Sequence, residues 1–354
     1  MEYLFIQETN YDNNQLKLLL NSLKKELTKT KCKIDHCPHL WDKIKKTIHL
    51  YEYVYTTSYY RKNISNIMPF SRSFFKMTEI IQEYKLLEED KKYNITCLAE
   101  APGGFIQSFL SHSSVQKIDA ITLISKDVKV PYWHKMLLTN DSINFHTGLN
   151  KDGDLYSLKN VLSFINNIGK SSVDIVTGDG GFDYSGDYNN QEKDSLKLIY
   201  SEIFIAINIQ KKGGCFICKI FDIFCEKTYQ LLYLLKQSYN NILIYKPCIS
   251  RLSNSEKYII CLDFRGYNKM IVNKMIHHFE DNNIDYEIEN DFLNCIYKIN
   301  KDYTKIQIDQ INYGIDLINH NNNIKNPSKK QITMAKDWCK MYDIEINKDC
   351  IYLN

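Results

Sequence analysis

Two lysines and two acids, far apart in the sequence, have the residue types for proton transfer: Lys76, Asp179, Lys219 and Glu256. An ordinary lysine has a pKa of about 10.4, so it is protonated at neutral pH and is a poor base. Burial and a second ammonium group lower the pKa of a lysine, whereas carboxylates raise it and hold the amine in place. We expect the balance to lower the pKa of Lys219, which would then remove a proton from a weak acid such as a ribose hydroxyl.

The residues around Lys219 predict a short buried strand. Gly213 and Gly214 are expected to end a preceding helix, and the apolar run that follows them breaks at Lys219. A second apolar run, over 173–178, ends directly before Asp179. Ligands of α/β proteins collect at the carboxyl ends of parallel strands, which is where both residues are placed. Taken alone, a lysine that leaves a strand into solvent is the better explanation of the Lys219 stretch.

The first predicted strand of the sheet covers 95–98, and a glycine-rich turn follows it. Glycines let a ligand approach the backbone closely, and the N-terminus of the helix that follows favours an anionic group. The spacing is not G-x-G-x-x-G, so a dinucleotide is not indicated, and a tight turn without a ligand stays the alternative. The turn reads Ala99-Glu100-Ala101-Pro102-Gly103-Gly104-Phe105.

The order of predicted elements indicates an α/β fold of the Rossmann type. A second strand is predicted over 121–125, and a third is expected to end near Asp154 and Leu155, where a carboxylate would accept from an exocyclic amine. Predicted strands over 242–245 and 257–262 are joined by so short a loop that they must be antiparallel. We therefore expect a mostly parallel sheet with one antiparallel strand. The predicted domains are a helical N-terminal extension over 1–65, an α/β domain over 66–268 and a mainly helical appendage over 269–354.

The composition excludes some classes of function. The net charge of the 354-residue chain is only +3, so a nucleic-acid surface would have to be a local patch. Eleven scattered cysteines are typical of a reducing, cytoplasmic compartment, and no apolar run reaches the roughly 18 residues of a membrane span. The cluster of Cys32, His36, Cys37 and His39 does not have the spacing of common zinc sites, so we expect no metal.

Aromatic and cationic residues alternate before the first lysine of the group, at Tyr59, Tyr60 and Arg61. Such residues stack on bases and hold phosphates, yet they are equally compatible with ordinary helix packing. Both interpretations stay open.

Five motifs, in order along roughly residues 65–265, resemble the cap-specific mRNA 2′-O-methyltransferases of the FtsJ-like group. They are Ser71-Arg72-Ser73-Phe74-Phe75-Lys76, Ala101-Pro102-Gly103-Gly104-Phe105, Asp179-Gly180-Gly181-Phe182, the stretch from Gly213 to Lys219 with Phe221-Asp222, and Lys246-Pro247 with Ser250-Arg251 and Asn254-Ser255-Glu256-Lys257-Tyr258. The sequence departs from this pattern at Cys97, where many relatives carry an acid at the end of the first strand.

The resemblance implies a Rossmann-like fold that binds S-adenosylmethionine and methylates the 2′-OH of the nucleotide next to the cap. It makes Lys219 the base, with Lys76, Asp179 and Glu256 as its partners. It assigns cofactor contacts to residues 99–105, Asp154, Leu155 and Asp179. RNA contacts are expected from Tyr59, Tyr60, Arg61, Arg72, Ser250, Arg251, Asn254 and Ser255.

The expected partners are capped RNA and other capping or transcription proteins, without a membrane. The composition suggests a large DNA virus or an AT-rich eukaryote, with localisation in the host cytoplasm or the virion. Two alternatives remain: an FtsJ-like methyltransferase of ribosomal or transfer RNA, and a non-catalytic RNA-binding scaffold with the same fold.

Overall fold

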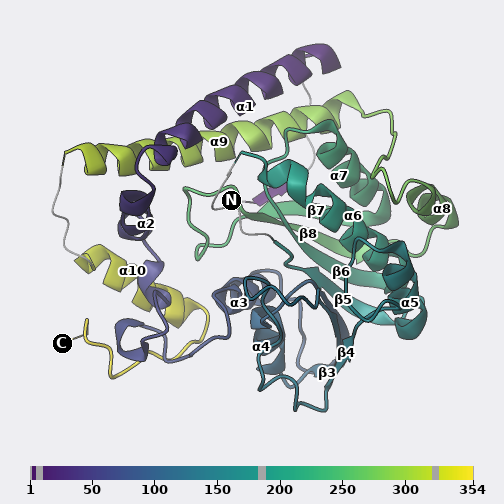
Figure 1. The fold of residues 1–354 in the computed structure, drawn as a ribbon, viewed down its shortest axis with the longest axis horizontal. Coiled ribbons are helices and arrows are strands. Elements are labelled where there is room, and N and C mark those ends of the chain that lie inside the picture. The colour runs from purple at the N-terminus through teal and green to yellow at the C-terminus, as the bar shows by residue number, and fades with distance from the viewer. Residues whose placement is uncertain (1, 5–10, 182–188, 321–326, 354) are drawn as a thin grey trace.

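An eight-stranded sheet runs through the centre of the computed structural model, which describes residues 2–4, 11–181, 189–320 and 327–353 (Figure 1). The strand order is β1-β7-β8-β6-β5-β2-β3-β4. The strands are β1 (Glu2–Leu4), β2 (Tyr93–Leu98), β3 (Val115–Ile121), β4 (Ile143–His146), β5 (Val173–Gly178), β6 (Gln210–Ile220), β7 (Tyr239–Tyr245) and β8 (Lys257–Phe264).

The sheet is mostly parallel, as predicted. Strands β6, β5, β2, β3 and β4 pair in parallel, and β8 lies antiparallel between β6 and β7. Strand β1, which pairs antiparallel with β7, was not predicted, because it belongs to a segment that was expected to be helical. Three residues are too few to show an alternating pattern. This segment therefore becomes a strand through its backbone pairing with β7 at the edge of the sheet.

Three predicted boundaries are wrong. The second strand, predicted over 121–125, is β3, which begins at Val115 and ends at Ile121. The third predicted strand is β4, which ends at His146 and not near Asp154. Asp154 lies in the loop that precedes α5 (Leu158–Ile168). Helix α6 (Gln191–Ile209) ends before the two glycines, which lie inside β6. There Gly213 has a φ of +84°, and the pairing of β6 with β5 shifts from Gln210 to Cys215. The glycines therefore allow an irregularity in the strand and do not stop the helix.

Helices cover both faces of the sheet and bury its apolar side chains. Residues of α3 (Ser73–Glu83) and α4 (Gly104–Leu110) form one core with the sheet. Residues of α5, α6 and α7 (Glu226–Ser238) belong to the core on the other face, which α8 (Lys269–His277) extends. The mostly parallel sheet is thus buried on both faces, as its continuous apolar strands require.

The helices predicted at both ends of the chain are present and pack on one another. In Figure 1, α1 (Asn13–Asp35) lies along α9 (Asn290–Asn319), and α2 (Pro38–Thr47) and α10 (Lys329–Met341) lie on the same side of the molecule. Two short 3-10 turns, η1 (Glu52–Val54) and η2 (Tyr60–Lys62), connect α2 to the sheet domain. Trp41 of α2 packs so closely on Gly314 of α9 that a Cβ there would lie 2.6 Å from the indole ring. None of the described helices is both long and apolar enough to span a bilayer.

Candidate active site

Lys219 and Asp179 meet because they stand at the carboxyl ends of two neighbouring parallel strands, β6 and β5. The Lys219 Nζ donates to the backbone oxygen of Asp179 at 2.8 Å and lies 3.4 Å from its Oδ1. Gly181 passes close to the amine, since a Cβ at this position would lie 3.0 Å from Nζ. Both charged side chains are mostly buried, so their interaction is little screened by water.

Lys76 and Glu256 form the second pair of the site. Lys76 lies in the first turn of α3, and Glu256 directly precedes β8, whose antiparallel direction brings its start to the edge where β6 ends. The Lys76 Nζ lies 2.6 Å from the Glu256 Oε1, which also accepts a hydrogen bond from Ser250. Glu256 and Lys219 also line one and the same cleft, so the structure brings the two pairs together.

The pKa of Lys219 was expected to be lowered, but the charged groups of this cluster raise it. Burial lowers the pKa of Lys219, but the carboxylates of Asp179, Glu256 and Glu202 together outweigh it and raise the pKa above its ordinary value. The pKa of Glu256, although burial raises it, is held well below its usual range by Lys76 and Lys219. The amine is therefore protonated at neutral pH in the unliganded protein, because the carboxylates of Asp179 and Glu256 favour its charged form.

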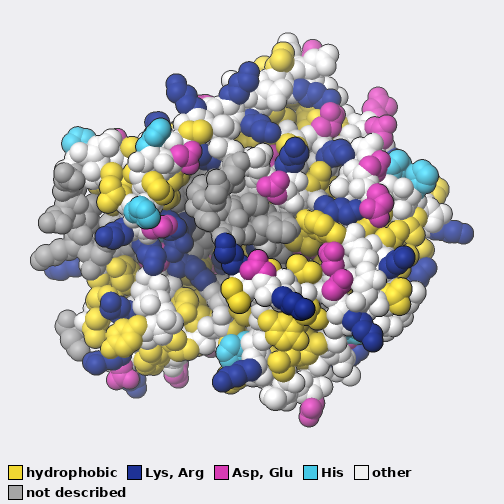
Figure 2. All heavy atoms as spheres, in the orientation of Figure 1, with side chains coloured by type: hydrophobic (Ala, Val, Ile, Leu, Met, Phe, Trp, Pro, Cys, Tyr) yellow, Lys and Arg dark blue, Asp and Glu magenta, His cyan; other side chains and the backbone are white. Residues whose placement is uncertain are grey.

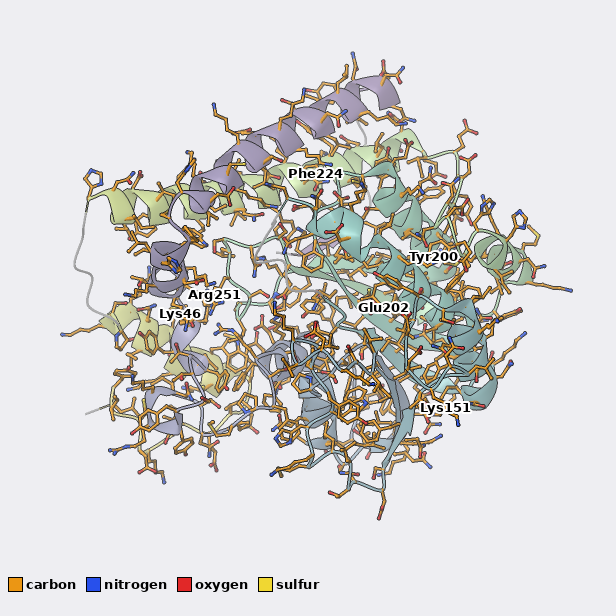
Figure 3. All side chains as sticks on the ribbon, viewed as in Figure 1. Lys46, Lys151, Tyr200, Glu202, Phe224 and Arg251 are labelled. Atoms are coloured by element: carbon orange, nitrogen blue, oxygen red, sulfur yellow. The ribbon has the colours of Figure 1, made fainter. Side chains whose placement is uncertain are left out.

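Two residues around Asp179 were given no role by the sequence analysis. Tyr258 is paired with Lys219 in the β6–β8 register, and its hydroxyl donates to the Asp179 Oδ1 at 2.8 Å. Glu202 of α6, labelled in Figure 3, is buried under the turn that carries Asp179. It accepts from the Cys218 Sγ at 3.2 Å, and burial raises its pKa to about 8. An acid on the apolar face of a predicted helix was the signal for Glu202. The pairing of β8 with β6, which brings Tyr258 to Asp179, joins strands that are not consecutive and had no signal in the sequence.

At the glycine-rich turn after β2, the helix N-terminus was expected to favour an anionic group of a ligand, but a side chain of the protein bonds there instead. The Glu100 carboxylate points inward, is buried, and accepts from the amide of Phe105 at 2.6 Å in the first turn of α4. The acceptor at this helix N-terminus is thus supplied by the chain itself, and burial raises the pKa of the Glu100 carboxyl well above its ordinary value. Gly103 adopts a left-handed φ of +112° as the residue that precedes α4, and a Cβ at Gly104 would overlap the Ser71 and Ser73 hydroxyls.

The remaining residues of this turn are fixed by neighbouring elements. Ala99 has a positive φ of +51°, and its amide donates to the Ile121 carbonyl of β3 at 2.8 Å. Ala101 packs on the core that α4 shares with the sheet, and the Pro102 carbonyl accepts from the amide of His134 at 3.0 Å. The turn therefore presents backbone, rather than charged side chains, at the carboxyl edge.

Asp154 and Leu155 lie at the same edge, beside the end of β3. Gly153 has a φ of +67°, and a Cβ there would lie 1.9 Å from the Thr122 carbonyl, so the loop is pressed against the chain that leaves β3. The Asp154 carboxylate is partly exposed and accepts from the amide of Tyr156, while Leu155 is buried. Two apolar side chains that follow β3 remain exposed, those of Leu123 and Ile124. A carboxylate next to an exposed apolar surface fits the polar edge and the flat face of a nucleoside.

Arg72 and Arg251, both predicted to contact RNA, converge on a single buried carboxylate, that of Glu52. Arg251 binds Glu52 through two nitrogens, at 2.9 and 3.1 Å. Arg72 lies 3.4 Å from the same carboxylate and donates to the carbonyls of Tyr55 and Ile249. Burial lowers the pKa of Arg72 to about 10. Arg72 therefore joins segments of the fold, whereas Arg251, labelled in Figure 3, reaches the cleft described below.

The other predicted RNA contacts separate into two groups. Asn254 and Ser255 lie beside Glu256 in the cleft wall, where Lys246 donates to Asn254 and Lys31 to Ser255. Within the described part of the chain, the 59–61 segment lies outside that wall. Its carbonyls and the Arg61 side chain instead bond to the C-terminal segment over 347–351. The Phe182 of the quoted motif lies outside the described residues.

A cleft of about 270 Å³ opens next to Lys219. Its lining combines cations, amides and hydroxyls, and on the face drawn in Figure 2 Lys and Arg side chains gather beside α2. Among the described residues, no group of three or more His, Cys, Asp or Glu side chains is placed to bind a metal ion. The lining residues are Lys31, Ile34, Trp41, Lys45, Gly181, Gln191, Lys219, Phe221, Arg251, Ser253, Asn254, Ser255, Glu256 and Gln307.

Comparison with known proteins identifies a family. The model of the FtsJ-like methyltransferases matches residues 69–264, which is more than half of the chain and includes the four clustered residues. Cap-specific mRNA (nucleoside-2′-O-)-methyltransferase 1 of Trypanosoma brucei brucei is 31% identical over 182 residues, which are 51% of this chain and 48% of that protein. Cap-specific mRNA (nucleoside-2′-O-)-methyltransferase 2 of Danio rerio is 28% identical over 243 residues, 63% of this chain and 32% of that protein.

The chain thus matches less than half the length of these curated relatives. Among solved structures, a putative ribosomal RNA methyltransferase from Plasmodium falciparum is similar with a TM-score of 0.40 and 21% identity. That match covers 56% of this chain and 99% of the Plasmodium chain, and at this score it supports no argument.

Proposed function

Because the chain belongs to the FtsJ-like methyltransferase family, we propose that it transfers a methyl group from S-adenosylmethionine to the ribose 2′-OH of the cap-proximal nucleotide of mRNA. The observation that carries this proposal is the convergence of Lys76, Asp179, Lys219 and Glu256 at the carboxyl edge of the sheet. The relatives named above, which are cap-specific 2′-O-methyltransferases, support the choice of substrate.

The residues of the carboxyl edge fit the methyl donor. The turn over 99–105 would hold its amino-acid end through backbone groups, and Asp154 with Leu123 and Ile124 would hold its nucleoside. When bound, S-adenosylmethionine supplies an electrophilic methyl group that carries positive charge.

Lys219 is the base in this proposal. Its neutral amine would accept the proton of the 2′-OH as that oxygen bonds to the methyl carbon of bound S-adenosylmethionine. The sulfur–carbon bond of the donor would break, with S-adenosylhomocysteine as the leaving group. Asp179 and Glu256 fix the position of the amine and stabilise the ammonium group that forms. Tyr258 holds the Asp179 carboxylate in place, and Lys76 does the same for Glu256. Because the carboxylates raise the pKa of Lys219, the neutral amine is a minor form until a positive charge comes close and lowers that pKa.

Two other functions fit the same fold. A methyltransferase of ribosomal or transfer RNA would use the same four side chains on an uncapped substrate. A non-catalytic RNA-binding scaffold would have no need to keep the four side chains together, so their ion pairs favour an enzyme.

The test is a methyl-transfer assay with RNAs of one sequence that differ only at the 5′ end: an N7-methylated cap, an unmethylated guanosine cap and a triphosphate. Transcripts of transfer and ribosomal RNA serve as further substrates. We expect 2′-O-methylation of the first transcribed nucleotide in capped RNA alone, located by nuclease digestion and mass spectrometry. Equal methylation of the triphosphate RNA, or preference for the uncapped transcripts, would overturn the cap-specific assignment. Absence of transfer to every RNA would favour the scaffold.

A further inference from the structure

One wall of the cleft next to Lys219 is built by parts of the chain that lie outside the family-matched range. Helix α1 contributes Lys31 and Ile34, α2 contributes Trp41 and Lys45, and α9 contributes Gln307. The family model begins at residue 69 and ends at residue 264, so all five residues come from the two extensions. The chemistry of this wall is therefore a property of this chain and not of the matched domain.

The wall carries more positive than negative charge. The buried Glu52 carboxylate pairs with two guanidinium groups, those of Arg72 and Arg251. The Asp222 carboxylate lies 2.8 Å from the Lys31 Nζ and 3.9 Å from the Lys257 Nζ. Each carboxylate thus faces two basic side chains. At Glu52 this leaves an excess of positive charge, whereas burial lowers the pKa of Lys257 to about 8 and makes the excess at Asp222 smaller.

Neighbouring groups respond to this excess of positive charge. Burial, followed by the charges of Arg72 and Arg251, lowers the pKa of His49 well below its ordinary value. The pKa of Lys246 is also well below its ordinary value, mainly because the amine is buried and next because Lys257 lies near it. Glu256 is an acid of the cleft lining, and its Oε1 lies 2.6 Å from the Lys76 Nζ, which balances its charge. The local potential is therefore positive although the net charge of the chain is close to zero.

We propose that the extension wall, formed by Lys31, Ile34, Trp41, Lys45 and Gln307, binds a phosphate group of the RNA substrate, with Lys45 as the contacting side chain. This inference rests on the proposed function, since it assumes that an RNA strand enters the cleft beside Lys219. Lys45 reaches the cleft from α2 and pairs with Asp42, an exposed partner that a phosphate replaces at little cost. Lys31 stays bonded to Asp222 and Ser255, so it contributes charge and not contact.

Helix geometry supplies a matched control for Lys45. Trp41 and Lys45 are four residues apart and both line the cleft, as residues on one helical face do. Lys43 lies between them on the same helix, is exposed, and is not a residue of the cleft lining. Reversing the charge at either position changes the net charge of the protein equally, so only a local contact distinguishes the two variants.

The experiment compares Lys45→Glu with Lys43→Glu in the full chain. Binding of a capped RNA 10-mer is measured by fluorescence anisotropy at several salt concentrations, and the KM for the same RNA is measured in the methyl-transfer assay. We expect Lys45→Glu to weaken RNA binding about three- to tenfold and to reduce the slope of log Kd against log salt by about 0.7, the value for one phosphate of a single strand. We expect Lys43→Glu to change neither quantity. Lys45→Gln, which removes the charge without reversing it, should give a smaller loss in the same direction.

Equal effects of the two reversals on Kd and on the salt slope would overturn the inference. So would a lower kcat for Lys45→Glu with unchanged RNA affinity. The anisotropy measurement does not need turnover. If the wild-type protein bound RNA without methylating it, the proposed function would fail while the comparison of Lys45 with Lys43 would still decide this inference. Binding of S-adenosylmethionine by calorimetry, expected to be unchanged in all three variants, shows that each variant is folded.

Discussion

Lys31 and Asp222 form an ion pair of 2.8 Å that joins the N-terminal extension to the segment directly after the strand of Lys219. Lys31 is 5% exposed and Asp222 is 13% exposed, and the Ser255 hydroxyl bonds to both. The carboxylate holds α1 against β6 and the 253–256 loop, so the extension helices and the catalytic strand share one anchoring point. The pKa of Asp222 lies below its ordinary range because, although burial raises it, Lys31 and Lys257 lower it.

Replacing Lys31 by alanine should destabilise the protein by about 3 kcal/mol, since it leaves a buried carboxylate with its more distant cation alone. Lys17→Ala is the matched control on the same helix. Lys17 also forms an ion pair, with Glu226 of α7, but both side chains are about half exposed, and such a pair contributes less than about 1 kcal/mol. Urea denaturation of both variants measures the difference. Equal losses for the two would show that Asp222 does not depend on Lys31.

Replacing Lys219 by alanine should lower kcat for methyl transfer by at least about 10²-fold, the usual contribution of a positioned general base. Affinity for S-adenosylmethionine should be nearly unchanged, since Lys219 lies with Asp179 and Glu256 and not in the turn over 99–105. Lys219→Arg should be equally inactive, because a guanidinium group does not give up its proton at neutral pH. The control is Lys212→Ala, an exposed lysine earlier on the same strand. Single-turnover assays that leave Lys219→Ala with most of its activity would refute the assignment of the base.

The clustering of Asp179, Lys219 and Glu256 was predictable because each stands beside a recognisable strand, whereas Lys76 was placed with them by the resemblance to the family. Asp179 and Lys219 end apolar strands, and the carboxyl ends of adjacent parallel strands meet at one edge. Glu256 precedes the antiparallel strand that the short loop before it predicts, and this strand starts where β6 ends. Local patterns thus determined which positions come together.

The electrostatic balance and the wall of the cleft were not predictable in this way. Asp179 and Glu256, with Glu202 from the middle of α6 as a smaller third contribution, raise the pKa of the amine by more than burial lowers it, which is opposite to the expected change. Lys31 and Lys45 reach the cleft because α1 and α2 both pack on α9, where Lys33 bonds to Asn312 across 279 positions of the sequence. Amphipathic periodicity predicts that such helices form, but it does not identify the surface on which they pack.

Tyr59 remains a predicted RNA contact although it lies outside the described wall of the cleft. Its ring is 53% exposed, and an exposed aromatic ring next to a cation stacks on bases. Tyr59→Ala should therefore raise the KM for capped RNA about fivefold, the lower end of a single stacking contact, without changing the KM for S-adenosylmethionine. Tyr313→Ala is the control, because this tyrosine of α9 is exposed to the same degree, 52%. Identical RNA KM values for the two variants would remove Tyr59 from the RNA site.

Glu202→Gln should shift the pH dependence of methyl transfer to lower pH. The pKa of Lys219 is raised in part by the Glu202 carboxylate, so removing that charge lowers the pKa and increases the neutral amine at a given pH. Because the pKa of Glu202 is itself about 8, the carboxylate is ionised mainly above that pH. The shift should therefore appear on the part of the kcat profile above about pH 8, and the rates near pH 7 should change little. Glu192→Gln is the control, since Glu192 is a buried acid of the same helix whose carboxylate bonds to the amide of Cys225. If both variants follow the wild-type profile, or if both lose activity equally at every pH, then Glu202 supports the fold without tuning the base.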